Sequence, residues 1–460
     1  MIENMKEKIF TLALAGLLVC PAVFAKKATK EYQRPSLHMV LLNTDEPTSP
    51  EVADVMPAVS ASWGNYEFPA LYNNHKVDFQ EMKAGNPKGG IMELVTKYPA
   101  EKLMNITDIN MLKEISEMSK GKEYMADLKQ RVDEVSGEVA RQMVAKWYNI
   151  TPDGQWNLNY LAEKACYSAT QNASQSAADE TGDAYSTMIN QLAEPTVSNT
   201  YVTFSKLAFY YNEPLAKFNS ELIRLIGQLT ADAAGQPMLA MATNAAAAKY
   251  YETNKDGYAA YTTTLLYKLK WTEEIQAAFQ AAFLTSDGWK GTIDVDKFNA
   301  IPFELEYMGA DQAHTTVILK KDDKDLSKEE AVTKTIHKNI NKQLVSLQNT
   351  YEEFKPMVPI VAVDKKFMLA DMGTKESVVE GDKFDVLEPY TNDKGVVKYR
   401  SVGVVKVLKG GIWDNEGVDN TTVVDNANFS GEEVEIQGTK VSALKTANVN
   451  MLVKKQKTKK

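Results

Sequence analysis

Cysteine and histidine are scarce in this chain of 460 residues, which has two cysteines and four histidines. Two cysteines cannot form the disulfide framework on which small secreted domains depend. No histidine lies within five residues of another, which excludes a local His-x-x-x-His metal motif. The sequence also lacks a Gly-x-Ser-x-Gly nucleophile elbow and a phosphate-binding glycine loop. We therefore expect no catalytic residue, no metal site and no cofactor.

A strong excess of one charge is missing as well, because 52 lysines and arginines oppose 61 acidic residues. The resulting net charge of −9 works against nucleic-acid binding, so we expect no nucleic-acid partner. The end of the chain departs from this balance, since five of the seven residues 454–460 are lysines. We interpret 454–460 as a solvated basic tail, and docking of this tail to an acidic surface is the alternative.

The N-terminus carries an apolar run over residues 9–20, preceded by two lysines. This run is too short for a membrane span, which needs about 20 residues. Together with the small residue Ala25, it is typical of a secretory signal peptide, 1–25, and predicts a mature chain that begins at Lys26. A lipoprotein acylated at Cys20 is the alternative. The protein is thus predicted to be exported, periplasmic or associated with the cell envelope, with no transmembrane helix after removal of the signal.

The hydrophobic pattern predicts a mixed fold, α+β or α/β, with a helix-rich N-terminal and middle region. The first region, 26–195, is predicted to be mixed and mostly helical. An apolar strand at 37–42 is followed by a turn-rich segment with scattered aromatic residues, 43–90, which we expect to be an ordered loop packed on a surface. Apolar residues at helical spacing then predict helices over 107–147 and 156–194.

The second region, 196–356, is predicted to be an α/β region. Aromatic and β-branched residues predict two paired strands, 199–211 and 258–271, and a helical insertion, 213–256, lies between them. Residues 303–319 are predicted to form a hairpin that turns near Gly309.

A capping box begins the last helix of this region. Ser327 and Glu330 occupy the first and fourth positions of the box, ahead of a long apolar stripe. Pro356 and Pro359 are expected to end the helix and to mark a domain boundary.

The third region, 360–453, has short strands separated by glycine-rich turns, which predicts a small all-β barrel. Its strands include Phe367-Met-Leu-Ala-Asp-Met-Gly373, Val379-Glu-Gly-Asp-Lys-Phe-Asp-Val386 and Arg400-Ser-Val-Gly-Val-Val-Lys-Val407. This layout over 366–413 resembles the C-terminal β-barrel of the flagellar assembly protein FlgT, and is similar to exported bacterial proteins of unknown function. The resemblance implies an envelope-associated assembly or binding role without naming a ligand.

The region before the barrel is similar to a second kind of envelope protein. An early strand and the helix start at Ile106-Thr-Asp-Ile-Asn-Met-Leu112 resemble the CsgG-type secretion-component fold.

Aromatic residues and one histidine in the turn-rich segment are the candidate ligand contacts. They are Trp63, Tyr66, Phe68, Tyr72 and His75. Aromatic rings can stack on a sugar or a protein partner, and they can equally fill a core.

Three functions follow from these observations. The leading hypothesis is a non-enzymatic, exported binding or assembly protein with envelope or assembly protein partners, of undetermined ligand and oligomeric state. One alternative is a secreted hydrolase whose carboxylates meet only in the fold, since such pairs leave no sequence pattern. The other is a ligand-binding module that uses the aromatic segment 63–72.

Overall fold

The computed structural model describes most of the chain between residues 35 and 456. The described residues are 35–43, 49–68, 72–75, 81–83, 85, 87–103, 109–168, 196–286, 290–321, 324–355, 357–376, 378–391, 397–414, 422–425, 433–449 and 451–456. The predicted signal peptide and Cys20 lie outside this set. Helices and strands are interspersed along the chain, and the strands form several separate sheets. The predicted mixed α+β class is therefore confirmed.

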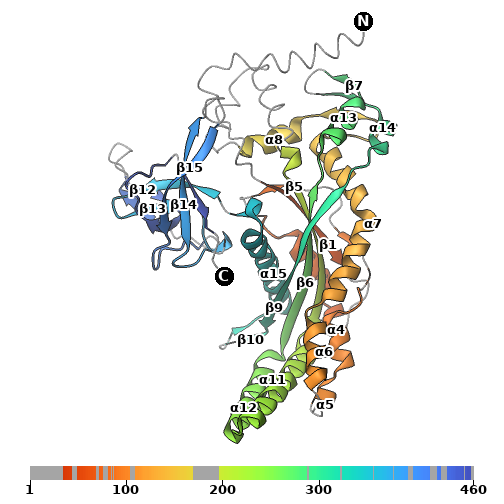
Figure 1. The fold of residues 1–460 in the computed structure, drawn as a ribbon, viewed down its shortest axis with the longest axis vertical. Helices are drawn as coiled ribbons and strands as arrows, with labels where there is room; N and C mark the ends of the chain where they lie inside the picture. Colours follow the sequence, from red (N-terminus) through yellow and green to blue (C-terminus); the bar gives the residue numbers. More distant parts are fainter. Residues whose placement is uncertain are drawn as a thin grey trace.

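A six-stranded central sheet organises the larger part of the molecule (Figure 1). Its strands are β1 (Ser36–Asn43), β2 (Asn73–Asn74), β3 (Glu81–Lys83), β5 (Thr200–Tyr211), β6 (Gly257–Leu269) and β9 (Leu305–Ile318). Strand β1 runs parallel to β5, while β5, β6 and β9 are consecutive antiparallel neighbours. The predicted pairing of the strands at 199–211 and 258–271 is confirmed.

Helices cover both faces of this sheet (Figure 1). Helix α15 (Lys328–Thr350) lies on one face with the short helices α2 (Pro50–Ala53) and α3 (Met56–Gly64), and they bury one apolar cluster against it. Helix α7 (Lys122–Trp147) buries a second cluster on the opposite face. The predicted capping box of α15 is confirmed, because both of its hydrogen bonds are present.

Two long helices connect β5 to β6. They are α11 (Glu213–Ala234) and α12 (Pro237–Asn254), and they confirm the predicted helical insertion. They pack closely because Gly227 faces Thr243: a Cβ at Gly227 would lie 2.3 Å from the Thr243 Oγ1 atom. Shorter helices pack against α11 and complete this end of the molecule. They are α4 (Ile91–Lys97), α5 (Ala100–Leu103) and α6 (Ile109–Ser119).

A small subdomain adjoins the C-terminal end of α7. Its three-stranded sheet contains β4 (Gln155–Asn157), β7 (Phe283–Ser286) and β8 (Lys290–Ile293), and its helices are α8 (Asn159–Ser168), α13 (Glu273–Ala281) and α14 (Val295–Ala300). Trp147, Trp156 and Phe279 belong to its apolar cluster. Helix α8 confirms the predicted helix over 156–194 from Asn159 to Ser168, but Trp156 and Asn157 belong to strand β4, so the predicted start is wrong. Residues 169–194 lie outside the described residues.

The C-terminal part forms a sheet of its own. Its strands, in spatial order, are β15 (Val397–Lys406), β14 (Lys383–Thr391), β19 (Leu452–Lys455), β12 (Met357–Val363), β13 (Phe367–Ala370) and β18 (Thr439–Ser442). The sheet curls into a half-barrel around a buried apolar cluster, and an isolated bridge between Val407 and Val441 brings its two ends together. Minor elements are β16 (Thr422–Asp425), β17 (Glu433–Ile436), β10 (Lys320–Lys321), β11 (Lys324–Asp325) and the 3₁₀ turns Glu352–Phe354 and Thr374–Glu376.

The predicted hairpin over 303–319 is wrong, because β9 is one continuous strand from Leu305 to Ile318. Gly309, the predicted turn residue, lies inside this strand. A Cβ at Gly309 would lie 2.2 Å from the Tyr351 hydroxyl oxygen, so the missing side chain leaves room for that tyrosine. The glycine therefore serves a close approach and not a turn.

Three other expectations need correction. Part of the expected loop 43–90 is helical, since α2 and α3 lie within it. The expected basic tail does not begin at Lys454, because Lys454 and Lys455 belong to β19, between β14 and β12. Pro359 does not follow a helix end; it lies within β12, where it pairs with Leu452.

Candidate binding site

The five predicted contact residues are mostly used for packing. Trp63 is 8% exposed, Tyr72 is 4% exposed and His75 is fully buried. Tyr66 and Phe68 pack against the apolar cluster beneath α15. Of the five, the structure brings Trp63, Tyr66 and Phe68 together around a shallow hollow of about 70 Å³.

The side chains around this hollow are already engaged. The Tyr66 hydroxyl donates a hydrogen bond to Asn341 Oδ1, and the Tyr66 ring meets the His337 ring edge-on at 5.4 Å. Tyr72 points elsewhere, with its ring 5.5 Å from that of Phe354. These contacts attach the 63–72 segment to the neighbouring elements, which is a sufficient reason for its aromatic content.

His75 belongs to a separate, buried aromatic cluster. Its ring stacks on Trp147 with 4.2 Å between centroids, and Tyr160 covers the pair. Its Nε2 atom lies 3.0 Å from the Met143 carbonyl oxygen. Burial, with His38 nearby, lowers the pKa of His75 to about 3, so the ring is neutral at physiological pH.

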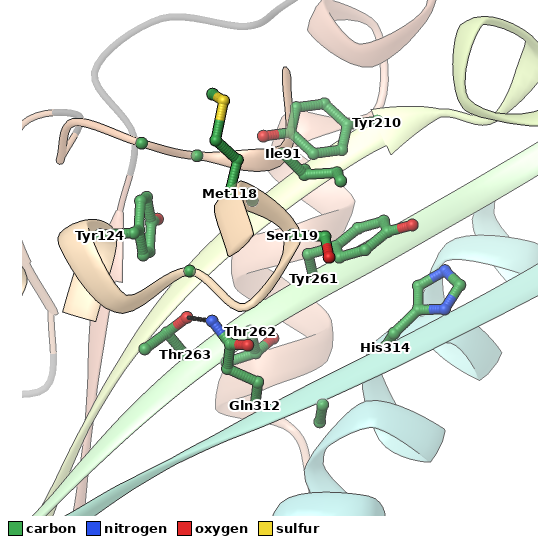
Figure 2. Close-up of a pocket in the computed structure, with 15 residues that line it drawn as sticks. Ile91, Met118, Ser119, Tyr124, Tyr210, Tyr261, Thr262, Thr263, Gln312 and His314 are labelled. Atoms are coloured by element: carbon green, nitrogen blue, oxygen red, sulfur yellow. Dashed lines mark hydrogen bonds between the residues drawn. The ribbon is translucent and has the colours of Figure 1, made fainter. Parts of the chain in front are cut away.

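A larger pocket lies on the α7 side of the central sheet (Figure 2). Its volume is about 180 Å³. Strands β5, β6 and β9 form its floor, while residues 89–91 and the turn between α6 and α7 form its rim. We call it the tyrosine pocket, after Tyr124, Tyr210 and Tyr261 in its lining.

The three tyrosines bring unused hydroxyl groups to this pocket. Tyr210 is only 8% exposed, and Tyr124 and Tyr261 are partly buried. Among the residues that the structure describes, none of these hydroxyls has a hydrogen-bond partner. Burial raises the pKa of Tyr261 to about 12 and raises the pKa of Tyr210 and of Tyr124 further, so all three remain protonated donors at neutral pH.

His314 stands at the mouth of the pocket, opposite Tyr261 in the β6–β9 register. The two rings stack with 4.1 Å between centroids, and His314 Nε2 lies 3.1 Å from the Thr316 hydroxyl. Loss of hydration on the covered ring, and the positive charge of Lys342, lower the pKa of His314. The imidazole is therefore a neutral wall of the pocket near pH 7.

Gln312 links β9 to β6 beside the α6–α7 turn. Its Nε2 atom donates a hydrogen bond of 3.3 Å to the Thr263 hydroxyl, drawn in Figure 2. Gly121, at the turn, has φ +60, and a Cβ there would lie 2.5 Å from that same Nε2 atom. Glycine at this position thus permits both the left-handed turn and the approach of Gln312.

The lining is polar but uncharged at neutral pH. None of the described lining residues is an aspartate, glutamate, lysine or arginine. Within the described part of the chain, no group of three histidine, cysteine or acidic side chains could hold a metal ion. The pocket can therefore offer hydrogen bonds and aromatic faces to a ligand, but not a paired acid and base.

Comparison of the sequence with models of known protein families gives no match, and no curated protein is similar to it in sequence. The resemblances to the FlgT barrel and to the CsgG-type fold therefore rest on the residues quoted above and stay predictions.

The sequence did not identify the residues of the tyrosine pocket as a site. It did predict the two paired strands that carry Tyr210, Tyr261 and Thr263, and the structure confirms these strands. What it could not supply is the register that puts Tyr210 and His314 on either side of Tyr261. The signal that existed was a run of tyrosine and threonine on paired strands.

Proposed function

We propose that this chain is an exported, non-enzymatic binding protein of the cell envelope that takes a small uncharged ligand into the tyrosine pocket. The observation that carries the proposal is Tyr210: the residue is 8% exposed, it lines a pocket without charged side chains, and its hydroxyl has no hydrogen-bond partner among the described residues. This hydroxyl is not among the buried polar atoms that are shut off from water, so a ligand that fills the pocket displaces water from it and has to offer a hydrogen bond in return.

The lining favours binding over hydrolysis. A hydrolase of the kind considered above would place two facing carboxylates in a cleft. The tyrosine pocket supplies none among its described lining residues, and its histidine is stacked on Tyr261 without a carboxylate to orient it. Export, from the predicted signal peptide, and the FlgT-like barrel support a place in the envelope, with protein partners there. None of the helices in the described part of the chain is long and apolar enough to cross a membrane.

A ligand-observed NMR screen of the full chain tests this proposal. The library contains neutral, anionic and cationic compounds, each built on one six-membered ring. We expect the hits to be neutral, and we expect them to be lost in Ser119→Trp, which blocks the rim of the pocket. Ser119 is exposed, so this substitution leaves the core intact.

Two results would contradict the proposal. One is a set of hits that bind Ser119→Trp as well as they bind the wild type. The other is a preference for charged compounds, which the uncharged lining does not accommodate.

A further inference from the structure

We infer that the ligand of the tyrosine pocket is a single neutral hexopyranose ring, either a free sugar or the end unit of a glycan. This inference rests on the proposed function and adds the chemical class of the ligand. Three properties of the pocket carry it: size, charge and the kind of hydrogen-bonding groups in the lining.

The volume corresponds to one ring. An apolar cavity of about 150 Å³ admits benzene. The tyrosine pocket, at about 180 Å³, therefore admits one six-membered ring, and a hexopyranose, which has twice as many heavy atoms as benzene, would keep some of its substituents at the mouth of the pocket. The exposed side chains of Gln312 and His314 at its mouth leave an opening through which a second unit of a glycan could extend.

The uncharged lining disfavours charged ligands of this size. A phosphate or carboxylate would lose its hydration without meeting a cationic side chain, and an amine would lose its hydration without meeting a carboxylate. His314 adds no positive charge to the lining near pH 7, because burial lowers the pKa of its imidazole.

The hydroxyl groups select against an apolar ring. Tyr124, Tyr210 and Tyr261 bring three unengaged hydroxyls, and Ser119 and Gln312 add further polar groups. A hydrocarbon ring would displace water from the Tyr210 hydroxyl without replacing its hydrogen bond, and sites built for hydrogen bonding reject ligands that lack the matching groups. A hexose presents several hydroxyls, and its C–H groups can lie against the electron-rich faces of the tyrosine rings.

Isothermal titration calorimetry of the full chain tests the inference with four neutral sugars: D-glucose, D-galactose, D-mannose and N-acetyl-D-glucosamine. D-Glucuronate and glucose 6-phosphate are the charged probes, and phenol is the neutral ring without sugar hydroxyls. We expect at least one neutral sugar to bind, with binding about 3- to 10-fold weaker in Tyr210→Phe, which removes one hydrogen bond and keeps the ring. The matched control is Tyr390→Phe in the C-terminal sheet, where binding should be unchanged.

Disaccharides distinguish the two sources of the sugar. If maltose or chitobiose binds at least as tightly as its monomer, the pocket holds the end of a glycan, and weaker binding of both indicates a free sugar. The inference is overturned if the charged probes bind as well as the neutral sugars, if Tyr210→Phe binds like the wild type, or if no sugar binds.

Failure of the sugar inference and failure of the proposed function give different results. Binding of phenol or of other neutral hits, lost in Ser119→Trp, with no sugar binding, overturns the inference and leaves a binding pocket. If no neutral compound of either set responds to Ser119→Trp, both are wrong.

Discussion

At the scale of single residues, His75 is the side chain whose chemistry depends most on its surroundings. Its Nε2 atom faces the Met143 carbonyl, which can only accept, so Nε2 carries the proton and Nδ1 is bare. Nδ1 is buried without a hydrogen-bond partner in the described chain. Burial and the nearby positive charges of Lys146 and Lys164 all disfavour a second proton.

We expect acid to destabilise the fold through His75. In the unfolded chain its pKa is near 6.5, and in the fold it is about 3. Between these values the unfolded state binds the extra proton, so the free energy of unfolding falls as the pH falls, by up to about 1.4 kcal/mol per pH unit. Urea unfolding of the wild type and His75→Gln at pH 7, 6, 5 and 4 should show their stability difference narrowing over this window.

A control from the same aromatic cluster separates titration from packing. Tyr160→Phe removes the hydrogen bond from the Tyr160 hydroxyl to the Asn74 carbonyl and introduces no group that titrates in this window. It should cost about 1 kcal/mol at every pH. A pH-independent difference between the wild type and His75→Gln would contradict the account of His75.

Sequence reasoning could single out His75 but not explain it. A lone histidine beside aromatic residues made His75 a candidate ligand contact, whereas the structure buries it against Trp147 and Tyr160, which lie more than 70 positions away. Burial of a histidine depends on such distant contacts, and no local pattern encodes them.

At the scale of elements, Gly309 in β9 illustrates how a local signal misleads. Glycine beside polar residues is a common turn signal, yet here the absent side chain accommodates Tyr351, the residue that follows α15. The strand stays continuous because β6 pairs along its whole length, with one irregularity next to Leu266. The start of α15 could be predicted because its capping box depends only on Ser327 and Glu330, which are three residues apart in the sequence.

We expect Gly309→Ala to destabilise the fold when residue 351 is tyrosine, and not to destabilise it when residue 351 is phenylalanine. In the wild type, the new Cβ would lie 2.2 Å from the Tyr351 hydroxyl oxygen, which should destabilise the fold by about 1–3 kcal/mol. In the Tyr351→Phe background the nearest remaining atom, Cζ, would be 3.5 Å away. There the substitution should be neutral or stabilise by up to about 1 kcal/mol, because alanine restricts the unfolded chain more than glycine does.

A double-mutant cycle by urea unfolding gives the coupling directly. Additive effects of the two substitutions would show that the Gly309–Tyr351 approach is not what requires glycine.

At the scale of the whole molecule, the predicted boundary between 26–195 and 196–356 does not separate two units. Strand β1 pairs with β5 in one sheet, and α7 packs on that sheet. A parallel pair needs a long connection, so its two strands are distant in sequence and their pairing leaves no local trace. The C-terminal sheet was easier to predict, because short strands separated by turns can be recognised from neighbouring residues. Strand β19 was not predicted, because its two lysines were assigned to the basic tail 454–460.

We expect truncation after Val449 to unfold the C-terminal sheet alone. The cut removes β19, which hydrogen-bonds to both β14 and β12 and pairs with none of the described strands of the central sheet. Limited proteolysis should cleave within 357–449 and leave a resistant fragment that contains α15. The control Lys454→Met keeps the strand and removes only the ion pair to Glu352, at 3.0 Å, so it should change stability by less than about 1 kcal/mol. A truncated chain that resists proteolysis throughout would contradict the role of β19.

The proposed place of the protein in the envelope has its own test. When the full sequence is expressed in a bacterium, mass spectrometry of the mature protein should find Lys26 at the N-terminus. An intact first residue would contradict export by this signal, and a lipid-modified Cys20 would establish the lipoprotein alternative.

A crystal structure of the chain with its best neutral ligand tests the central claim most directly. The account expects ligand density in the tyrosine pocket, within hydrogen-bond distance of the Tyr210 hydroxyl and against the ring of Tyr261. Density instead beside Trp63, Tyr66 and Phe68, or at no single place, would contradict it.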